Sequence, residues 1–189
     1  YNKEWAVVYN TAQLYRHDRL DYIKNLFGDA QRENFLLGIK LVRGAYMEKE
    51  RERAIEKNYP SPIQPDKKST DADFNEALKF MVDHLDHFAI CAGTHNEDSS
   101  LRLAQLIEEK SLDKSDKRLY FAQLLGMSDH ISFNLAHHGY QVAKYVPYGP
   151  VKEVMPYLLR RADENTSVAG QTSRELNLLS KERKRRAAL

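Results

Sequence analysis

The sequence predicts an α/β protein built on a parallel β-sheet. Short runs rich in β-branched and aromatic residues alternate with longer stretches that have the apolar periodicity of amphipathic helices. Strands separated by helices of this length pair in parallel through right-handed crossovers. Hydrophobic residues make up 42% and charged residues 30% of the chain, a balance that is typical of globular domains and excludes disordered and fibrous classes.

Five strands and five helices are expected. The runs predicted as strands are apolar on both faces, as buried parallel strands usually are, and comprise residues 5–9, 35–42, 87–92, 119–125 and 141–146. The predicted helices comprise residues 18–34, 46–57, 71–85, 98–110 and 150–165. A connection over residues 58–69 contains three prolines and is expected to be a surface loop, with Thr70 or Asp71 capping the next helix. The last residues, 173–189, are expected to form a basic helical tail.

Two arrangements of parallel strands remain open at this point. A doubly wound sheet needs no more than five strands, whereas a closed (β/α)8 barrel typically needs about 250 residues. Because the chain has 189 residues, its length favours the open sheet. The chain opens on Tyr1 and soon reaches an apolar run, so we expect it to be a fragment without a signal peptide.

Charge and cysteine content exclude several classes of function. The segment from Arg174 to Leu189 has six basic and two acidic residues, which leaves 23 basic and 25 acidic residues in the rest of the chain. A near-neutral body argues against a dedicated nucleic-acid binder. The single cysteine, Cys91, excludes a disulfide framework and a cysteine-cluster metal site. No apolar run approaches the roughly 18 residues of a membrane span.

Unusual residues follow each predicted strand, where ligands of parallel α/β proteins bind. Thr94, His95 and Asn96 precede a helix, and a helix start with hydroxyl, imidazole and amide groups suits a phosphate. The alternative is an ordinary helix cap beside a surface histidine. Arg160 and Arg161 could grip a carboxylate with two guanidinium groups, or could form a solvated basic pair near a helix C-terminus.

Other motifs give little support for a site. His137 and His138 are adjacent, which is not a metal-ligand spacing, so no protein-bound metal is expected. Neither GxGxxG nor GxxxxGK[ST] occurs, which removes support for Rossmann and P-loop nucleotide sites. The basic residues within 181–186 indicate a solvated terminal helix, with contact to acidic membrane lipid as the functional alternative.

An ordered set of motifs resembles the proline dehydrogenase family, in its eukaryotic-type single-function form. The matching runs span nearly the whole chain in family order: VYNTAQ at 8–13, KLVRGAY at 40–46, THN at 94–96, QLLGM at 123–127, YVPYGP at 145–150 and YLLRRADEN at 157–165. This resemblance implies a (β/α)8 barrel of which residues 1–172 are strands four to eight with the final substrate-binding helix. It thereby reverses the expectation drawn from length.

The resemblance also implies the site residues and the reaction. Arg160 and Arg161 would bind the carboxylate of L-proline, inside a pocket walled by Leu41, Tyr46, Leu124, Tyr145 and Tyr157. FAD would be held by Gln13, Lys40, Val42, Gly44, Thr94, His95, Asn96 and Glu164. Lys40 stands where many relatives have an arginine, which keeps the charge but loses the guanidinium fork. The implied reaction transfers a hydride from proline C5 to flavin N5, giving pyrroline-5-carboxylate, and the electrons pass to a quinone.

The implied compartment is the bacterial cytoplasm at the membrane face, or the mitochondrial matrix and inner membrane, with peripheral membrane contact. Three rival hypotheses remain. Hydroxyproline dehydrogenase shares the fold, although Tyr145 is expected to crowd a 4-hydroxyl group. A non-catalytic half-barrel that acts as an interaction module would explain the absence of the first three strands. A basic-tailed adaptor for nucleic acid or lipid is the third.

Overall fold

A computed structural model describes the backbone of residues 1–167 and 169–188, and the side chains in these ranges other than those of residues 161–175 and 178. The chain divides into two compact units, Tyr1–Tyr145 and Val146–Leu189. Within these described ranges, all strands belong to the first unit, and two helices belong to the second.

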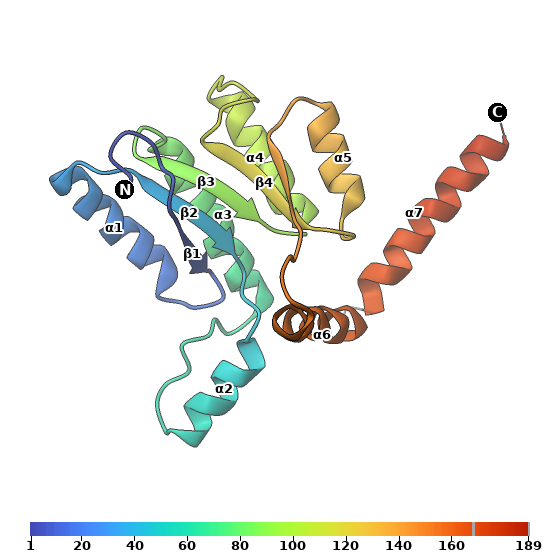
Figure 1. Cartoon of the computed structure of the whole chain (residues 1–189), viewed down its shortest axis with the longest axis horizontal. Helices are drawn as coiled ribbons and strands as arrows, with labels where there is room; N and C mark the ends of the chain where they lie inside the picture. The colour runs from blue at the N-terminus through green and yellow to red at the C-terminus, as the bar shows by residue number, and fades with distance from the viewer. Residues whose placement is uncertain (168, 189) are drawn as a thin grey trace. The chain divides into compact units, whose positions relative to one another are not determined.

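The first unit is built on five parallel strands that pair in the order of the sequence (Figure 1). They are β1 (Tyr9–Gln13), β2 (Leu37–Val42), β3 (Phe88–Gly93), β4 (Leu119–Leu124) and β5 (Val142–Tyr145). A doubly wound sheet reverses its strand order at a switch point, and this sheet does not. The sequential order is that of a barrel segment, so the open doubly wound sheet favoured by chain length is wrong, and the fold is a partial (β/α) barrel.

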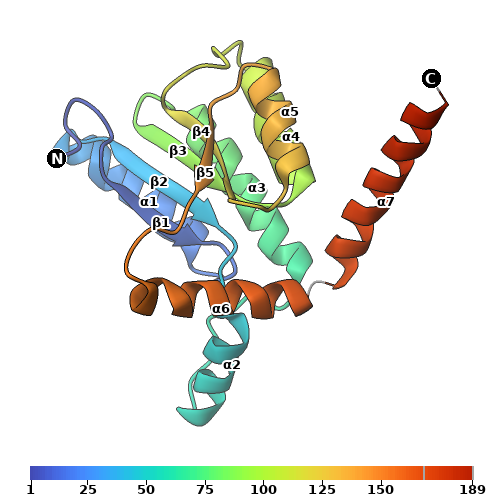
Figure 2. The same cartoon turned by 45° about the vertical axis from the view of Figure 1, so that its right-hand side comes forward.

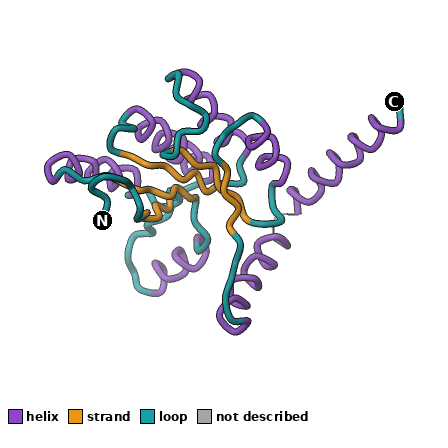
Figure 3. The backbone as a smooth tube through the Cα atoms, turned by 45° about the horizontal axis from the view of Figure 1, so that its top comes forward, coloured by secondary structure: helices purple, strands orange, loops and turns teal. Residues whose placement is uncertain are grey.

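Helices cover one face of this sheet. Because every crossover turns in the same direction, successive helices fall on the same side. Figures 2 and 3 show them outside the strands: α1 (Arg19–Glu33), α3 (Lys67–Asp83), α4 (Glu97–Glu109) and α5 (Asp129–His137). Helix α3 packs against both α1 and α4. Helix α2 (Met47–Glu56) is inserted between β2 and α3 and projects from the carboxyl end of the strands (Figure 1).

The hydrophobic core lies between the sheet and the helices. Ile39 and Leu41 of β2 pack with Phe74 and Leu78 of α3, and all four side chains are fully buried. The opposite face is only half-buried: in β4 buried and intermediate residues alternate along the strand, and in β5 intermediate and exposed residues alternate. The expectation that the strands are buried on both faces is therefore wrong for this chain, since the second face is the inner surface of an incomplete barrel.

The first strand begins four residues later than expected. Residues 5–8 contain no strand because the side chain of Asn2 binds their backbone: its Oδ1 accepts hydrogen bonds from the N–H groups of Val7 and Val8, at 3.0 and 2.9 Å. Val7 and Val8 are exposed. Residues 5–8 therefore precede the strand, whose ladder starts where Tyr9 pairs with Gly38.

Two helix predictions need correction. Helix α3 starts at Lys67 because Asp66, in an extended conformation, accepts a hydrogen bond from the Ser69 N–H at 2.7 Å. The cap is therefore Asp66 and neither Thr70 nor Asp71, and the proline-rich loop is shorter than expected. Helix α5 was not predicted; it is only nine residues long, and its N-cap, Ser128, lies in the left-handed region at φ 51° without a side-chain cap.

The second unit contains α6 (Val151–Ser167), with Pro156 inside it, and α7 (Ala169–Ala187). The basic segment predicted as a tail lies within α7 and its C-terminal end, and the boundary at residue 172 stays a prediction. Among the helices of the described chain, none combines the length and the apolar character that a membrane crossing needs.

An ion-pair cluster links α3 to the end of α4. Asp83 accepts hydrogen bonds from Lys110 at 2.6 Å and Lys79 at 2.8 Å, which lower the pKa of Asp83 from 3.8 to about 2. The charged carboxylate thus stabilises the fold fully above about pH 4, and this contribution is lost as the pH falls through 2.

We expect Asp83→Asn to lower the free energy of unfolding at pH 7 by about 1 kcal/mol, as for a partly exposed pair. Denaturant unfolding of the intact protein between pH 7 and pH 2 measures this. The difference in free energy of unfolding between Asp83→Asn and wild type should vanish near pH 2. At pH 7 this difference should be smaller in a Lys110→Met background. A difference that stays constant with pH would contradict the ion pairing of Asp83 with the two lysines.

Candidate functional site

The loops that follow the strands all emerge at one edge of the sheet, because the strands are parallel and in sequence order. This edge, which we call the rim, carries the residues directly after Gln13, Val42, Gly93 and Leu124. It is where ligands bind in barrels of this kind. The predicted motifs that follow these four strands therefore share one edge of the first unit.

The segment Thr94–Asn96 joins β3 to the start of α4 and is held rigidly. Asn96 caps the helix, since its Oδ1 accepts from the Ser99 N–H at 2.8 Å. Thr94 Oγ1 accepts from the Asn96 N–H at 3.1 Å, and the Thr94 N–H donates to the carbonyl of Ala122 at 3.1 Å. The N–H groups of a helix start attract anions, so this geometry supports both an ordinary cap and an anion site.

Two side-chain contacts join this loop to the start of α5. His95 Nδ1 lies 2.9 Å from the hydroxyl of Ser128, which is buried. His130 Nε2 lies 2.9 Å from the carboxylate of Glu97. The contact with Ser128 orients the ring of His95. The contact between His130 and Glu97 joins the first turn of α5 to the first turn of α4.

Lys40 and Tyr145 meet on the inner face of the sheet. They lie on β2 and β5, three strand spacings or roughly 14 Å apart in a flat sheet. Lys40 Nζ nevertheless lies 5.5 Å from the centre of the Tyr145 ring, in a cation–π contact. Cys91, next to Lys40 in the strand register, is half-buried, and burial raises the pKa of its thiol. The inner face thus carries one cation beside an aromatic wall.

Two glycines at the rim pack closely against neighbouring residues. A Cβ on Gly93 would lie 3.0 Å from the carbonyl oxygen of Leu41 and 3.1 Å from the side chain of Val42. Gly44 has φ +130°, and a Cβ there would lie 2.4 Å from the ring of Tyr15. Gly44 is therefore required by the packing of Tyr15, whether or not a cofactor approaches it.

The other residues predicted for the site differ in their surroundings. Gln13 and Leu124 are half-buried at the ends of β1 and β4, and Tyr46 is partly exposed as the N-cap of α2. Leu41 is fully buried in the hydrophobic core. By the alternation of a strand it points away from the face that carries Lys40 and Val42. Its role in a substrate pocket stays a prediction that this placement does not favour.

The remaining predicted residues belong to the second unit. Tyr157 and Arg160 are three residues apart in α6, so they lie on the same side of that helix. The side chains of Arg161 and Glu164 lie outside the described part of the chain.

The donors on the rim fit an anionic, phosphate-bearing cofactor. Thr94, His95 and Asn96 surround a helix start, and Lys40 supplies a positive charge. A metal centre has less support: within the described residues, no group of three or more His, Cys, Asp or Glu side chains could hold a metal ion.

Comparison with known proteins identifies the family. The sequence profile described as proline dehydrogenase matches residues 1–174. The chain belongs to the proline dehydrogenase family. It is 45% identical to proline dehydrogenase 1, mitochondrial, of Homo sapiens over 182 residues, 95% of this chain and 30% of the relative. It is 41% identical to the Drosophila melanogaster protein of the same name, covering 98% of this chain and 29% of the relative.

A family member with a different name is also similar. Hydroxyproline dehydrogenase of Xenopus laevis is 39% identical over 98% of this chain and 41% of its own length. The chain therefore spans less than half the length of these curated relatives, and about 30% of the human and fly proteins.

Solved structures confirm the partial barrel. Proline utilization A from Bdellovibrio bacteriovorus, inactivated by N-propargylglycine, superposes with a TM-score of 0.81 at 27% identity, covering 88% of this chain and 17% of that one. A Bradyrhizobium japonicum protein of the same name, at 24% identity, gives a TM-score of 0.77 and supports the fold alone.

Several polar residues that organise the rim were not predicted from the sequence. Ser128 and Lys144 are examples: Lys144 Nζ donates to the carbonyl of Met127 at 2.7 Å and to Asp129 at 2.8 Å, which holds the loop after β4. Ser128 and Lys144 occur in ordinary local sequences. The role of these two residues in holding the loops is visible only in contacts between segments that are distant in the sequence.

Substitution of two glycines tests the packing at Gly44. We expect Gly44→Ala to destabilise the intact protein by about 2 kcal/mol or more, because its φ and the Tyr15 ring both oppose a Cβ. Gly28 lies in α1 with nothing within 4 Å of a built Cβ. Gly28→Ala should therefore stabilise the protein by up to about 1 kcal/mol. Thermal unfolding measures the change in stability of both variants. Changes of the same sign in Gly44→Ala and Gly28→Ala would contradict the structure.

Proposed function

We propose that the protein of which this chain is a part oxidises L-proline to pyrroline-5-carboxylate with FAD as its cofactor. The observation that carries the proposal is the match to the proline dehydrogenase family over residues 1–174. The placement of Lys40, Tyr145 and Thr94–Asn96 in the first unit supports it. FAD supplies the hydride acceptor when bound, so C5 of proline loses a hydride and the ring nitrogen loses a proton as the C=N bond forms.

This chain contributes the groups that hold the cofactor. The loop Thr94–Asn96 binds the diphosphate, with His95 oriented by its contact to Ser128. Lys40 would hold the flavin part of the cofactor with its positive charge. The proposed cofactor set comprises Gln13, Lys40, Val42, Gly44, Thr94, His95, Asn96 and Glu164.

The chain also contributes substrate-binding groups. Arg160 and Arg161 bind the carboxylate of proline, which fixes the orientation of the ring. Aromatic and aliphatic side chains form the pocket wall and exclude water. The proposed wall comprises Leu41, Tyr46, Leu124, Tyr145 and Tyr157, although the burial of Leu41 in the core makes it the weakest member.

The family and α7 support a proposal for the electron acceptor and the compartment. We propose that a quinone accepts the electrons and that the protein works in mitochondria, as the names of its relatives suggest. Leu176 and Leu179 of α7 are exposed, and basic residues follow them. An exposed apolar pair beside basic residues suits peripheral contact with acidic lipid.

Removing either arginine tests the assignment of the substrate site. We expect Arg160→Ala or Arg161→Ala in the complete protein to raise the KM for L-proline by about 100-fold, since a charged carboxylate loses a guanidinium partner. Bound flavin, measured by visible absorbance, should stay at the wild-type level. Arg32→Ala is the control, because Arg32 is exposed on α1 and pairs only locally with Asp29. An unchanged KM in either variant would overturn the carboxylate assignment.

A further inference from the structure

Arg43, the residue directly after β2, is the most connected side chain near the rim. Its Nε donates to Asp71 at 2.7 Å, its Nη1 to Thr94 Oγ1 at 2.7 Å and its Nη2 to Ser99 Oγ at 3.0 Å. Its guanidinium carbon lies 4.5 Å from the centre of the Phe74 ring. One planar group therefore joins the end of β2, the start of α3, the end of β3 and the first turn of α4.

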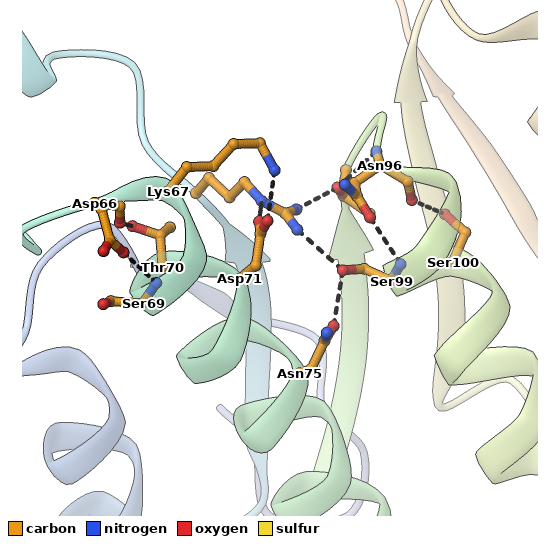
Figure 4. Close-up of polar contacts among 11 residues, drawn as sticks. Asp66, Lys67, Ser69, Thr70, Asp71, Asn75, Asn96, Ser99 and Ser100 are labelled. Atoms are coloured by element: carbon orange, nitrogen blue, oxygen red, sulfur yellow. Dashed lines mark hydrogen bonds and ion pairs between the residues drawn. The ribbon is translucent and has the colours of Figure 1, made fainter.

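Further hydrogen bonds hold the residues that Arg43 contacts. Ser99 Oγ accepts from Arg43 and donates to Asn75 Oδ1 at 2.7 Å. Asp71 also accepts a hydrogen bond from Lys67. Burial alone would raise the pKa of Asp71, but the hydrogen bonds from Lys67 and Arg43 outweigh it and lower the pKa. Figure 4 shows Asp71 and Asn75 of α3 facing Ser99 and Asn96 at the start of α4.

Thr94 is held from two sides. On the side of β2, Arg43 binds its hydroxyl. On the side of β4, the amide of Gln123 donates to its carbonyl at 3.2 Å, and Gln123 is in turn bound by Ser132 of α5 at 2.9 Å. Gln123 and Ser132 are buried. The Thr94 hydroxyl that Arg43 fixes is the same atom that binds the Asn96 N–H, so the contact determines the shape of the loop.

We propose that Arg43 is a positioning residue, which acts on FAD through Thr94–Asn96 rather than by touching it. This inference rests on the proposed function, because it takes the loop as the site of the diphosphate. The guanidinium fork is matched to three partners in three directions, which a lysine cannot reproduce. Asp71 neutralises the charge of Arg43 and orients its guanidinium group toward Thr94 and Ser99. The loop is thereby arranged for an anion before the anion binds.

The test compares the affinity of variants for FAD. Flavin-stripped complete protein is titrated with FAD, and quenching of flavin fluorescence gives the Kd. We expect Arg43→Met and Arg43→Lys to weaken binding by about tenfold or more, because both lose the fork. We expect Asp71→Asn to weaken it as well. Loss of a negative charge near an anion would by itself tighten binding. Positioning through Arg43 and a direct charge effect therefore predict changes of opposite sign in the affinity of Asp71→Asn for FAD.

A core variant separates positioning from loss of stability. Leu78 is fully buried in the same helix as Asp71 but lies outside the network, so Leu78→Ala should destabilise the fold and leave the Kd of the folded protein unchanged. The KM for L-proline at saturating FAD should stay at the wild-type value in Arg43→Met.

Three results would overturn the inference. The first is FAD binding that is tighter or unchanged in Asp71→Asn. The second is wild-type affinity for FAD in Arg43→Lys. The third is a loss of FAD affinity in Leu78→Ala that equals the loss in Arg43→Met. Wild-type protein without measurable affinity for FAD would instead overturn the proposed function, and the inference with it.

Discussion

The backbone pairing of five parallel strands in sequence order is the constraint on which the rest of the structure depends. It forces every crossover to turn the same way, so the helices of the first unit share one face and the inner face is left for a barrel interior. It also brings every loop that follows a strand to one edge. Lys40 and Tyr145 can meet over the inner face only because of this arrangement.

At this edge the polar contacts run between neighbouring βα units more than within them. Arg43 links the second βα unit of the sheet to the third βα unit. The third βα unit is linked to the fourth by Gln123, Ser128 and His130. Such contacts fix the loops without filling the space above the strands. The chain therefore combines a rigid loop between β3 and α4 with an inner face that is still half-exposed.

The sequence predicted the fold class and four of the five strands, since long apolar runs separated by amphipathic helices have few other solutions. It misplaced the first strand because Asn2 binds the backbone of Val7 and Val8, a contact that periodicity does not encode. The motif THN pointed to the start of α4, whereas no role was predicted for Arg43 or Ser128. Their partners are 28 to 56 residues away in the sequence, at Asp71, Ser99 and His95.

We propose that the complete protein is a flavin-dependent proline dehydrogenase. The most direct test of this activity is the visible spectrum of the purified complete protein under anaerobic conditions, before and after addition of L-proline. We expect a flavin absorption band that bleaches with L-proline and much less with 4-hydroxyproline. Absence of a flavin band, or a band that proline leaves unchanged, would contradict it.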